Sequence, residues 1–508
     1  MKSRSKGIAL SYVYLILNMV SGLFLSSYLI NSLGETEYGI YKTVASFVNY
    51  LILLEFGTGT VMTRNISMCR GSGESKEKIN EHISTIWTSA NVIGAIIAIV
   101  SVGMYFSLDF IYKKTLSPQQ LETAKNIFIF VVIHLIISFY LQTFKGITLG
   151  YEDYSFGSVI KTIRTLLRTV LLSLAIFFWK YSIVIAIVDT LIATAELISS
   201  YVYCKKKFDI SLSFKYFNKK IFLSILPFSF ALFLQTIVNQ ANNNVDSFLI
   251  GIFKSPEDVT FYSVSLFIFS VFSSACSVPV SMYAPQVAKE LSSGTSISEL
   301  TPKIASASKL TALVGGSILF GFIAAGKPFI ALLYGKEYLE QNVWIIAVIL
   351  MIPYLLAMLL SVVENILDVL GKRLIRSLAL MGTTLVNIAL TVWWLNVWGP
   401  LGAACSTFVC VMLGQVILMN IYYKKSIKIN VLYLYGQCFR RIIPCQAISS
   451  IAGYLVSSMI PFDSKLLSII SLLAGGGTYV IVFALTYLTV DKEARIKTVS
   501  VLNKFLKK

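Results

Sequence analysis

Four polar side chains recur on one face of a long apolar stretch near the middle of the sequence. Gln235, Asn239, Asn242 and Asp246 stand at i, i+4, i+7 and i+11, the spacing that lines up residues along one side of an α-helix. Amide groups both donate and accept hydrogen bonds, so this face could bind the hydroxyl groups of a sugar. In hydrocarbon, such groups must face a wet cavity or a neighbouring helix, and both interpretations are open.

A second stripe is cationic. Lys161, Arg164 and Arg168 stand at i, i+3 and i+7, and guanidinium groups bind phosphate oxygens in a bidentate manner. If the chain on either side of residue 180 folds as a hairpin, Arg164 comes level with Glu196 and Arg168 with Asp189. The stripe could therefore contact a pyrophosphate or form ion pairs within the membrane, and its first residues could also extend to the membrane surface.

Two further residues extend these groups. Asn18, on the same helical face as Tyr14 and Ser21, would offer a polar face from the first apolar segment. Arg64 ends the second apolar segment, where it could contact an anion or act only as a positive anchor at the membrane surface. We therefore count Asn18 and Arg64 with Gln235, Asn239, Asn242, Arg164 and Arg168 as candidate substrate-binding residues.

The elements that must position these residues are membrane-spanning helices. The 508 residues are 56% hydrophobic and only 13% charged, against about 25% charged in soluble proteins. Apolar stretches long enough to cross a bilayer occur about fourteen times, which predicts an all-α polytopic membrane protein. They lie near residues 9–33, 38–62, 85–107, 125–146, 156–179, 181–203, 223–251, 258–285, 305–326, 341–368, 374–396, 400–423, 442–461 and 465–490.

The basic residues predict the orientation. Of the 43 Lys and Arg residues, 31 lie in connections on one side of the predicted membrane, 7 lie on the other side, and 5 lie within spans. Because basic residues gather on the cytoplasmic side, both termini are expected in the cytoplasm. This distribution accounts for the net charge of +18 without a nucleic-acid partner.

Catalytic and metal sites are not predicted. The seven cysteines form no CxxC pair, the two histidines lie far apart in sequence, and the connections are too short for a catalytic domain outside the membrane. We expect neither a cofactor nor a bound metal ion.

The sequence also repeats itself at an offset of 221 residues. Tyr262 follows Tyr41 by 262 − 41 = 221, and the same offset relates Gly371 to Gly150 and Asn239 to Asn18. Six spans per copy predict two parallel six-helix lobes, although equal helix spacing alone could produce such an offset. The expected divisions are residues 1–215 and 216–430 for the lobes, 431–490 for an extra helix pair and 491–508 for a basic cytoplasmic tail.

Four short motifs follow one another along the chain. They read Leu-Gly-Glu-Thr-Glu-Tyr-Gly-Ile-Tyr at 33–41, Phe-Lys-Gly-Ile-Thr-Leu-Gly at 144–150, Val-Asp-Ser-Phe-Leu-Ile-Gly at 245–251 and Leu-Tyr-Gly-Lys-Glu-Tyr at 333–338. In this order they resemble the multidrug/oligosaccharidyl-lipid/polysaccharide flippase superfamily, and within it the flippases of O-antigen and capsule repeat units. The resemblance covers essentially the whole chain. It implies a MATE-like arrangement of the two lobes with two additional C-terminal helices.

The resemblance implies a transporter rather than an enzyme. Its substrate would be an undecaprenyl-pyrophosphate-linked oligosaccharide, moved across the bacterial cytoplasmic membrane by alternating access for surface polysaccharide biosynthesis. Expected partners are membrane lipid and a polysaccharide polymerase complex, and the last two helices would offer a groove for the prenyl tail. A cation-coupled multidrug exporter and a flippase of peptidoglycan lipid II are the alternatives; a membrane-bound glycan polymerase, an acyltransferase and a structural scaffold fit less well.

Transport without a nucleotide-binding motif needs another driving force, and the sequence contains no GxxxxGK[ST] loop. Proton or sodium coupling through Asp246 or Glu55 is one hypothesis, because both carboxylates fall inside predicted spans. Consumption of the product outside the cell is the other, and it requires no coupling residue.

Overall fold

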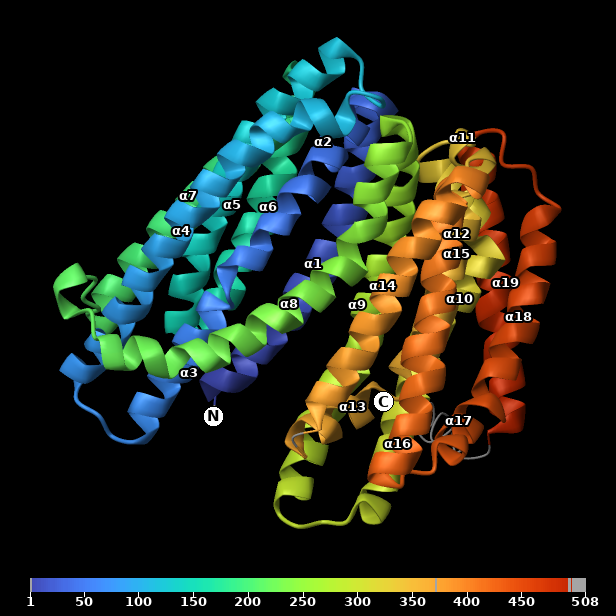
Figure 1. Ribbon diagram of the computed structural model, residues 1–508. Coiled ribbons are helices and arrows are strands. Elements are labelled where there is room, and N and C mark those ends of the chain that lie inside the picture. The colour runs from blue at the N-terminus through green and yellow to red at the C-terminus, as the bar shows by residue number, and fades with distance from the viewer. Residues whose placement is uncertain (1, 371, 492–494, 496–508) are drawn as a thin grey trace. The chain divides into compact units, whose positions relative to one another are not determined.

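The computed structural model describes residues 2–370, 372–491 and 495 (Figure 1). Side chains at 2–16, 235, 238, 239, 241–243, 368, 373–375 and 377 lie outside the described part, as does most of the expected tail at 491–508. All regular secondary structure in the described residues is helical, which confirms the all-α prediction.

Each apolar segment predicted in the first half coincides with a helix or with a broken helix. The elements are α1 (Lys2–Leu33), α2 (Glu35–Val48), η1 (Asn49–Glu55), α3 (Thr58–Gly71), α4 (Lys76–Tyr112), α5 (Pro118–Gly150), α6 (Tyr154–Phe178), α7 (Ile183–Phe208), η2 (Phe214–Tyr216) and α8 (Lys219–Phe253). The second span is broken: Phe56 and Gly57 adopt positive φ values of 49° and 66°, which end η1 before α3 begins.

The second half follows the same plan. Its elements are α9 (Pro256–Ser292), α10 (Ile297–Leu333), α11 (Glu337–Glu340), α12 (Val343–Met358), α13 (Ser361–Val369), α14 (Arg373–Trp398), α15 (Pro400–Val411), the π-helical turn η3 (Met412–Leu418), α16 (Met419–Ile427), α17 (Val431–Phe439), α18 (Ile442–Ser458) and α19 (Lys465–Val490).

Among the described residues, nine helical segments are long and apolar enough to span a membrane, counting α2–η1–α3 and α15–η3–α16 as one each, or ten if α12 and α13, bent by 50°, form one span. The multi-pass membrane fold is therefore confirmed, whereas the count of fourteen spans is not. Polar residues account for part of the difference, since stretches such as Lys161 to Arg168 lower the mean hydropathy of a helix.

Helix starts are set by local capping. Ser117 accepts a hydrogen bond from the backbone N–H of Gln120 at 3.3 Å, and the Gln120 side chain accepts one from the Ser117 backbone at 2.8 Å. This capping box, followed by Pro118 at the first helical position, begins α5. Asp153 caps α6 and Asn218 caps α8 by accepting bonds from the first-turn backbone.

The offset found in the sequence reappears in the helix bounds. The α2–α3 segment spans 35–71 and α9 spans 256–292, so that 256 − 35 and 292 − 71 both equal 221. Likewise α4 spans 76–112 and α10 spans 297–333, again separated by 221 at both ends. The sequence repeat is therefore a repeat of helices, although the α2–α3 segment is broken where its equivalent α9 is continuous.

Residue contacts divide the chain into two compact units, Met1–Thr260 and Phe261–Lys508. In the first unit, α8 packs against α2, η1, α3 and α4. In the second, α18 and α19 pack against each other and against α10. Small residues allow this contact: a Cβ atom added to Gly453 would lie 2.7 Å from the Gly475 carbonyl oxygen and 2.8 Å from the Ala324 Cβ. The division predicted at residue 215 stays a prediction.

Candidate functional site

A polar cavity of about 350 Å³ lies inside the first unit, between α1, α5, α6 and α7. The cavity brings together Asn18 and the stripe of Lys161, Arg164 and Arg168, four residues that the sequence singles out. The remaining polar residues of its wall are Ser21, Lys145, Thr165, Thr169 and Asp189. Because α1 packs along α6, the predicted polar face of the first helix meets the cationic stripe directly.

Arg168 forms a bidentate ion pair with Asp189 across the α6–α7 hairpin. Its Nε and Nη2 atoms donate to the two carboxylate oxygens at 2.6 and 2.9 Å. Such fork-to-fork pairs are among the strongest hydrogen-bonded contacts between side chains. The pair leaves Nη1 of Arg168, with its two protons, for another acceptor.

Glu196 lies on α7 between two cations. Its side chain is only 2% exposed, and its oxygens lie 3.2 Å from Lys145 Nζ and 3.3 Å from Arg164 Nη1. A buried carboxylate needs such partners because leaving water is costly for an isolated charge. The hairpin prediction is thus confirmed for both ion pairs, while the structure does not test whether the same arginines bind substrate.

The cavity carries an excess of positive charge. Four cations, Lys145, Lys161, Arg164 and Arg168, face two acids, Asp189 and Glu196. Lys161 is exposed, and the described residues include no acid within ion-pair distance of it. This excess of two positive charges favours an anionic ligand. The attraction between the cations and an anion is stronger in a partly desolvated cavity than in bulk water.

Sequence reasoning missed part of this wall. Lys145, Thr165 and Thr169 line the cavity but were not among the candidate residues. The signal was present in the sequence, because residues 161, 164, 165, 168 and 169 share one helical face of α6. The role of Lys145 depends instead on how α5 packs against α7, which spacing along one helix does not reveal.

The other candidate residues lie elsewhere. Arg64, on α3, places its guanidinium 4.2 Å from the ring centre of Phe228 on α8, a cation–π contact outside the polar cavity. Glu55 ends η1, and its backbone carbonyl accepts a hydrogen bond from Thr58 Oγ1 at 2.6 Å. Asp246 is half-buried on α8. The side chains of Gln235, Asn239 and Asn242 lie outside the described residues.

The described part of the chain contains no group of three or more His, Cys, Asp and Glu side chains that could hold a metal ion. Six of the seven cysteines are buried and none forms a disulfide; Cys405 is partly exposed.

Comparison with known protein families identifies the chain. A family model described as "Polysaccharide biosynthesis protein" matches residues 4–289, which is more than half of the sequence. The chain belongs to the polysaccharide biosynthesis protein family. No curated protein matches this family member by sequence.

Solved structures with a similar fold are membrane transporters. The lipid II flippase MurJ in an inward closed conformation shares 16% identity with a TM-score of 0.68, covering 94% of this chain and 99% of MurJ. An inward-facing multidrug resistance MATE transporter shares 14% identity with a TM-score of 0.57, covering 83% and 96%. The Vibrio cholerae MATE transporter VcmN shares 13% with a TM-score of 0.58, covering 85% and 100%. At these identities the likeness shows the fold alone, and it agrees with the predicted MATE-like class.

Proposed function

We propose that this member of the polysaccharide biosynthesis family is a flippase for an undecaprenyl-pyrophosphate-linked oligosaccharide. It would move this lipid from the cytoplasmic to the outer face of the bacterial cytoplasmic membrane, with both termini in the cytoplasm. The proposal rests above all on the polar cavity, where two cations more than acids lie beside the amide of Asn18. A pyrophosphate supplies the missing negative charge, and a sugar supplies partners for an amide.

Ion pairing and substrate contact are compatible at the arginines. Asp189 occupies two donor atoms of Arg168 and holds the guanidinium in place, while Nη1 stays available to a phosphate oxygen. Lys161, which pairs with no described acid, offers its charge to the substrate, and Glu196 lies between Lys145 and Arg164 and offsets their mutual repulsion. In this proposal the acids position the cations, and the substrate binds the donors that the acids leave free.

The remaining candidates keep their proposed roles on the same pathway. Gln235, Asn239 and Asn242 would contact the glycan, and Arg64 would contact phosphate when its cation–π contact with Phe228 opens. Asp246 or Glu55 would carry a coupling proton or sodium ion if transport is ion-driven. The two lobes would alternate in access, the helix pair of α18 and α19 would accommodate the prenyl tail, and a polymerase complex would consume the product. No chemical conversion of the substrate is proposed.

Deletion of the gene in its host tests the function. The expected result is loss of surface polysaccharide together with accumulation of the prenyl-linked repeat unit on the cytoplasmic face. Unchanged polysaccharide with new drug sensitivity would replace the proposal by a cation-coupled multidrug exporter. Lethality with accumulation of the peptidoglycan precursor would replace it by a lipid II flippase.

A further inference from the structure

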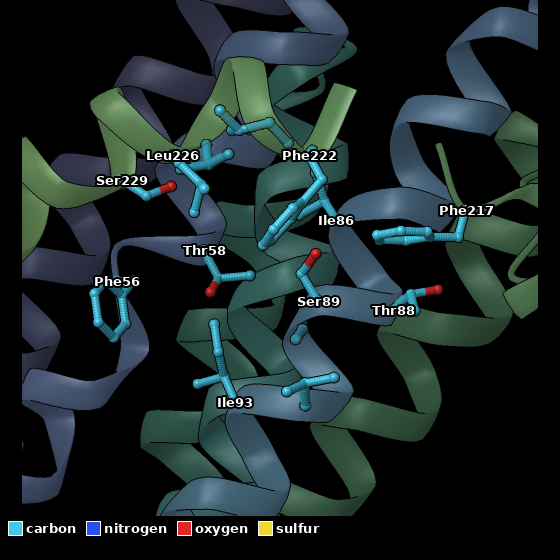
Figure 2. A pocket seen from close by; sticks show the side chains of 14 residues that line it. Phe56, Thr58, Ile86, Thr88, Ser89, Ile93, Phe217, Phe222, Leu226 and Ser229 are labelled. Atoms are coloured by element: carbon cyan, nitrogen blue, oxygen red, sulfur yellow. The ribbon is translucent and has the colours of Figure 1, made fainter. Parts of the chain in front are cut away.

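A second cavity in the first unit is lined mainly by apolar side chains and shares no lining residue with the polar cavity. It measures about 350 Å³ and lies between the start of α3, the first half of α4 and the first half of α8. Figure 2 shows Ile86, Ile93, Phe222 and Leu226 among the side chains that surround it. We call this space the α4–α8 cavity.

Of the four hydroxyl side chains that line the α4–α8 cavity, which are Thr58, Thr88, Ser89 and Ser229, two are committed to their own helices. Thr58 Oγ1 donates to the carbonyl of Glu55 at 2.6 Å, and Ser89 Oγ donates to the carbonyl of Thr85 at 2.9 Å. A water molecule inside the cavity would therefore find few of the two to four polar partners that it needs. The walls suit a hydrocarbon ligand.

The break in the second span helps to form this cavity. After Phe56 and Gly57 turn the chain with positive φ, the Phe56 ring stacks on Phe233 with centroids 4.6 Å apart. Leu232 of α8 fills the space beside Gly57, where an added Cβ would lie 2.6 Å from the leucine Cδ1. These contacts fix α8 against the break, and Thr58 then begins α3 at the cavity wall.

Side chains at the rim are accessible from outside the protein. Val92 on α4 is 60% exposed and Leu226 on α8 is 43% exposed, although both line the cavity. In a membrane-spanning helix, exposed aliphatic side chains face lipid. A lipid chain can therefore reach the cavity from the side without crossing a polar surface.

Three exposed lysines lie next to the cavity in sequence. Phe217 and Phe222 line the cavity, and Lys215, Lys219 and Lys220 stand beside and between them. None of the three forms an ion pair with a described acid, and Asn218 caps α8 by accepting bonds from the Lys220 and Ile221 backbone at 2.8 and 3.4 Å. Basic clusters of this kind at the end of a membrane helix attract anionic lipid headgroups.

We propose that the α4–α8 cavity binds one acyl chain of an anionic phospholipid, whose phosphate lies against Lys215, Lys219 and Lys220. The size favours this occupant, because about 350 Å³ lies near the lower end of ordinary small-ligand cavities and suits a single chain segment. A long prenyl tail would need a longer groove. The site is separate from the polar cavity, so this inference does not depend on the proposed transport activity.

Photo-crosslinking tests the site with the full chain reconstituted in lipid bilayers. The probe is a phosphatidylglycerol with a diazirine on one acyl chain, and the crosslinked peptides are identified by mass spectrometry. We expect crosslinks to concentrate at residues 86–93 and 222–229. The same probe with a phosphatidylcholine headgroup should label these peptides less, and each of Lys219→Gln and Lys220→Gln should weaken phosphatidylglycerol labelling by about fivefold.

Filling the cavity provides the matched variant. Ser89→Leu adds three carbons in the cavity and removes only a hydroxyl bonded to its own helix, so the melting temperature should stay unchanged while labelling falls. Gly103→Leu adds a comparable volume on the same helix at an exposed position with nothing within 4 Å, and should leave labelling intact. Equal labelling of all lipid-facing helices, equal labelling by both headgroups, or preferential labelling by a diazirine undecaprenyl phosphate would each overturn the proposal.

Discussion

Thr36, at the start of α2, donates a hydrogen bond to the carboxylate of Glu257, at the start of α9. The two residues are separated by 221 positions, the offset of the internal repeat, so equivalent positions of the two copies bind each other. A second bond joins the same helix starts, because Thr260 Oγ1 donates to the Glu35 carbonyl at 2.7 Å. The constant offset between the copies is thus accompanied by a direct contact inside the first unit.

Gly39→Ala tests how closely these helix starts approach. A Cβ atom at Gly39 would lie 1.9 Å from the carbonyl oxygen of Pro256, a backbone atom that cannot move aside alone. We expect the free energy of unfolding to fall by about 1 to 3 kcal/mol, as for an overpacked core. Thermal unfolding in detergent measures the effect. Gly157→Ala, on α6, is the control. A Cβ atom added at this position would have no neighbouring atom within 4 Å, so alanine should be neutral or slightly stabilising.

Lys161→Gln separates substrate binding from structure. Lys161 has no acid partner among the described residues, so its loss should leave the melting temperature within about 1 °C of the parent, as for a surface substitution. Transport of the pyrophosphate-linked lipid should fall about tenfold or more, because a hydrogen bond to a charged group contributes about 1.5 to 3 kcal/mol. The readout is surface polysaccharide in a complemented deletion strain. Lys180→Gln, an exposed lysine outside the polar cavity, should have no effect on transport.

Glu196→Gln should act chiefly on stability. The amide would leave Lys145 and Arg164 without their shared counter-charge, and breaking a buried ion pair costs about 3 kcal/mol. Chemical denaturation of the purified protein measures this loss. The double variant Glu196→Gln with Lys145→Met removes one of the two cations as well, and should recover part of the stability. No recovery would mean that Lys145 does not interact with Glu196.

Asp153 provides a test by pH, because it lies in the connection between α5 and α6. Burial raises the pKa of Asp153, but hydrogen bonds from Lys207 at 2.6 Å and from Tyr203 lower it, and the net pKa lies below its ordinary value of 3.8. A lowered pKa stabilises the folded protein at pH values above the pKa of the unfolded state. This stabilisation disappears as the pH falls through the pKa of the folded state.

Asp153→Asn should therefore lower the melting temperature at pH 7 by a few degrees, corresponding to about 1 kcal/mol since Lys207 is half-exposed. The difference between variant and parent should shrink when the pH falls below about 4. Scanning calorimetry across this range is the measurement. A difference that stays constant with pH would contradict the role of the carboxylate charge.

Hydrophobic patterning predicts where the membrane-spanning helices lie. It does not predict where the local backbone geometry breaks or distorts them. The predicted spans at 85–107 and 125–146 fall within α4 and α5, because long apolar runs mark the part of a helix that crosses the bilayer. The break at Phe56 and Gly57 was not predicted, since Phe rarely adopts positive φ and no proline marks the position. The π-helical turn of Met412–Leu418 was likewise not predicted, because it lies within a predicted span and hydrophobic patterning does not distinguish a π-helical turn from an α-helix.

The candidate site could be predicted where several of its residues lie on one helix. The stripe on α6 and its pairing with α7 follow from helical spacing and a short hairpin, and both ion pairs are present. Arg64 shows the limit of this reasoning: position along the chain does not say that its guanidinium packs on the Phe228 ring of α8. Motif residues such as Gly146 have a structural reason, because a Cβ there would lie 2.5 Å from the Gly59 carbonyl oxygen on α3.

The three-way ion pair of Lys145, Arg164 and Glu196 has a consequence for how related sequences diverge. Its members come from α5, α6 and α7, and loss of the glutamate leaves both cations without their shared counter-charge, whereas loss of one cation leaves the other paired with the glutamate. Replacement of the glutamate by a neutral residue should therefore occur in relatives that have also lost at least one of the two cations. Lys161, which pairs with no acid in the described part of the chain, would instead vary with the charge of the transported glycan.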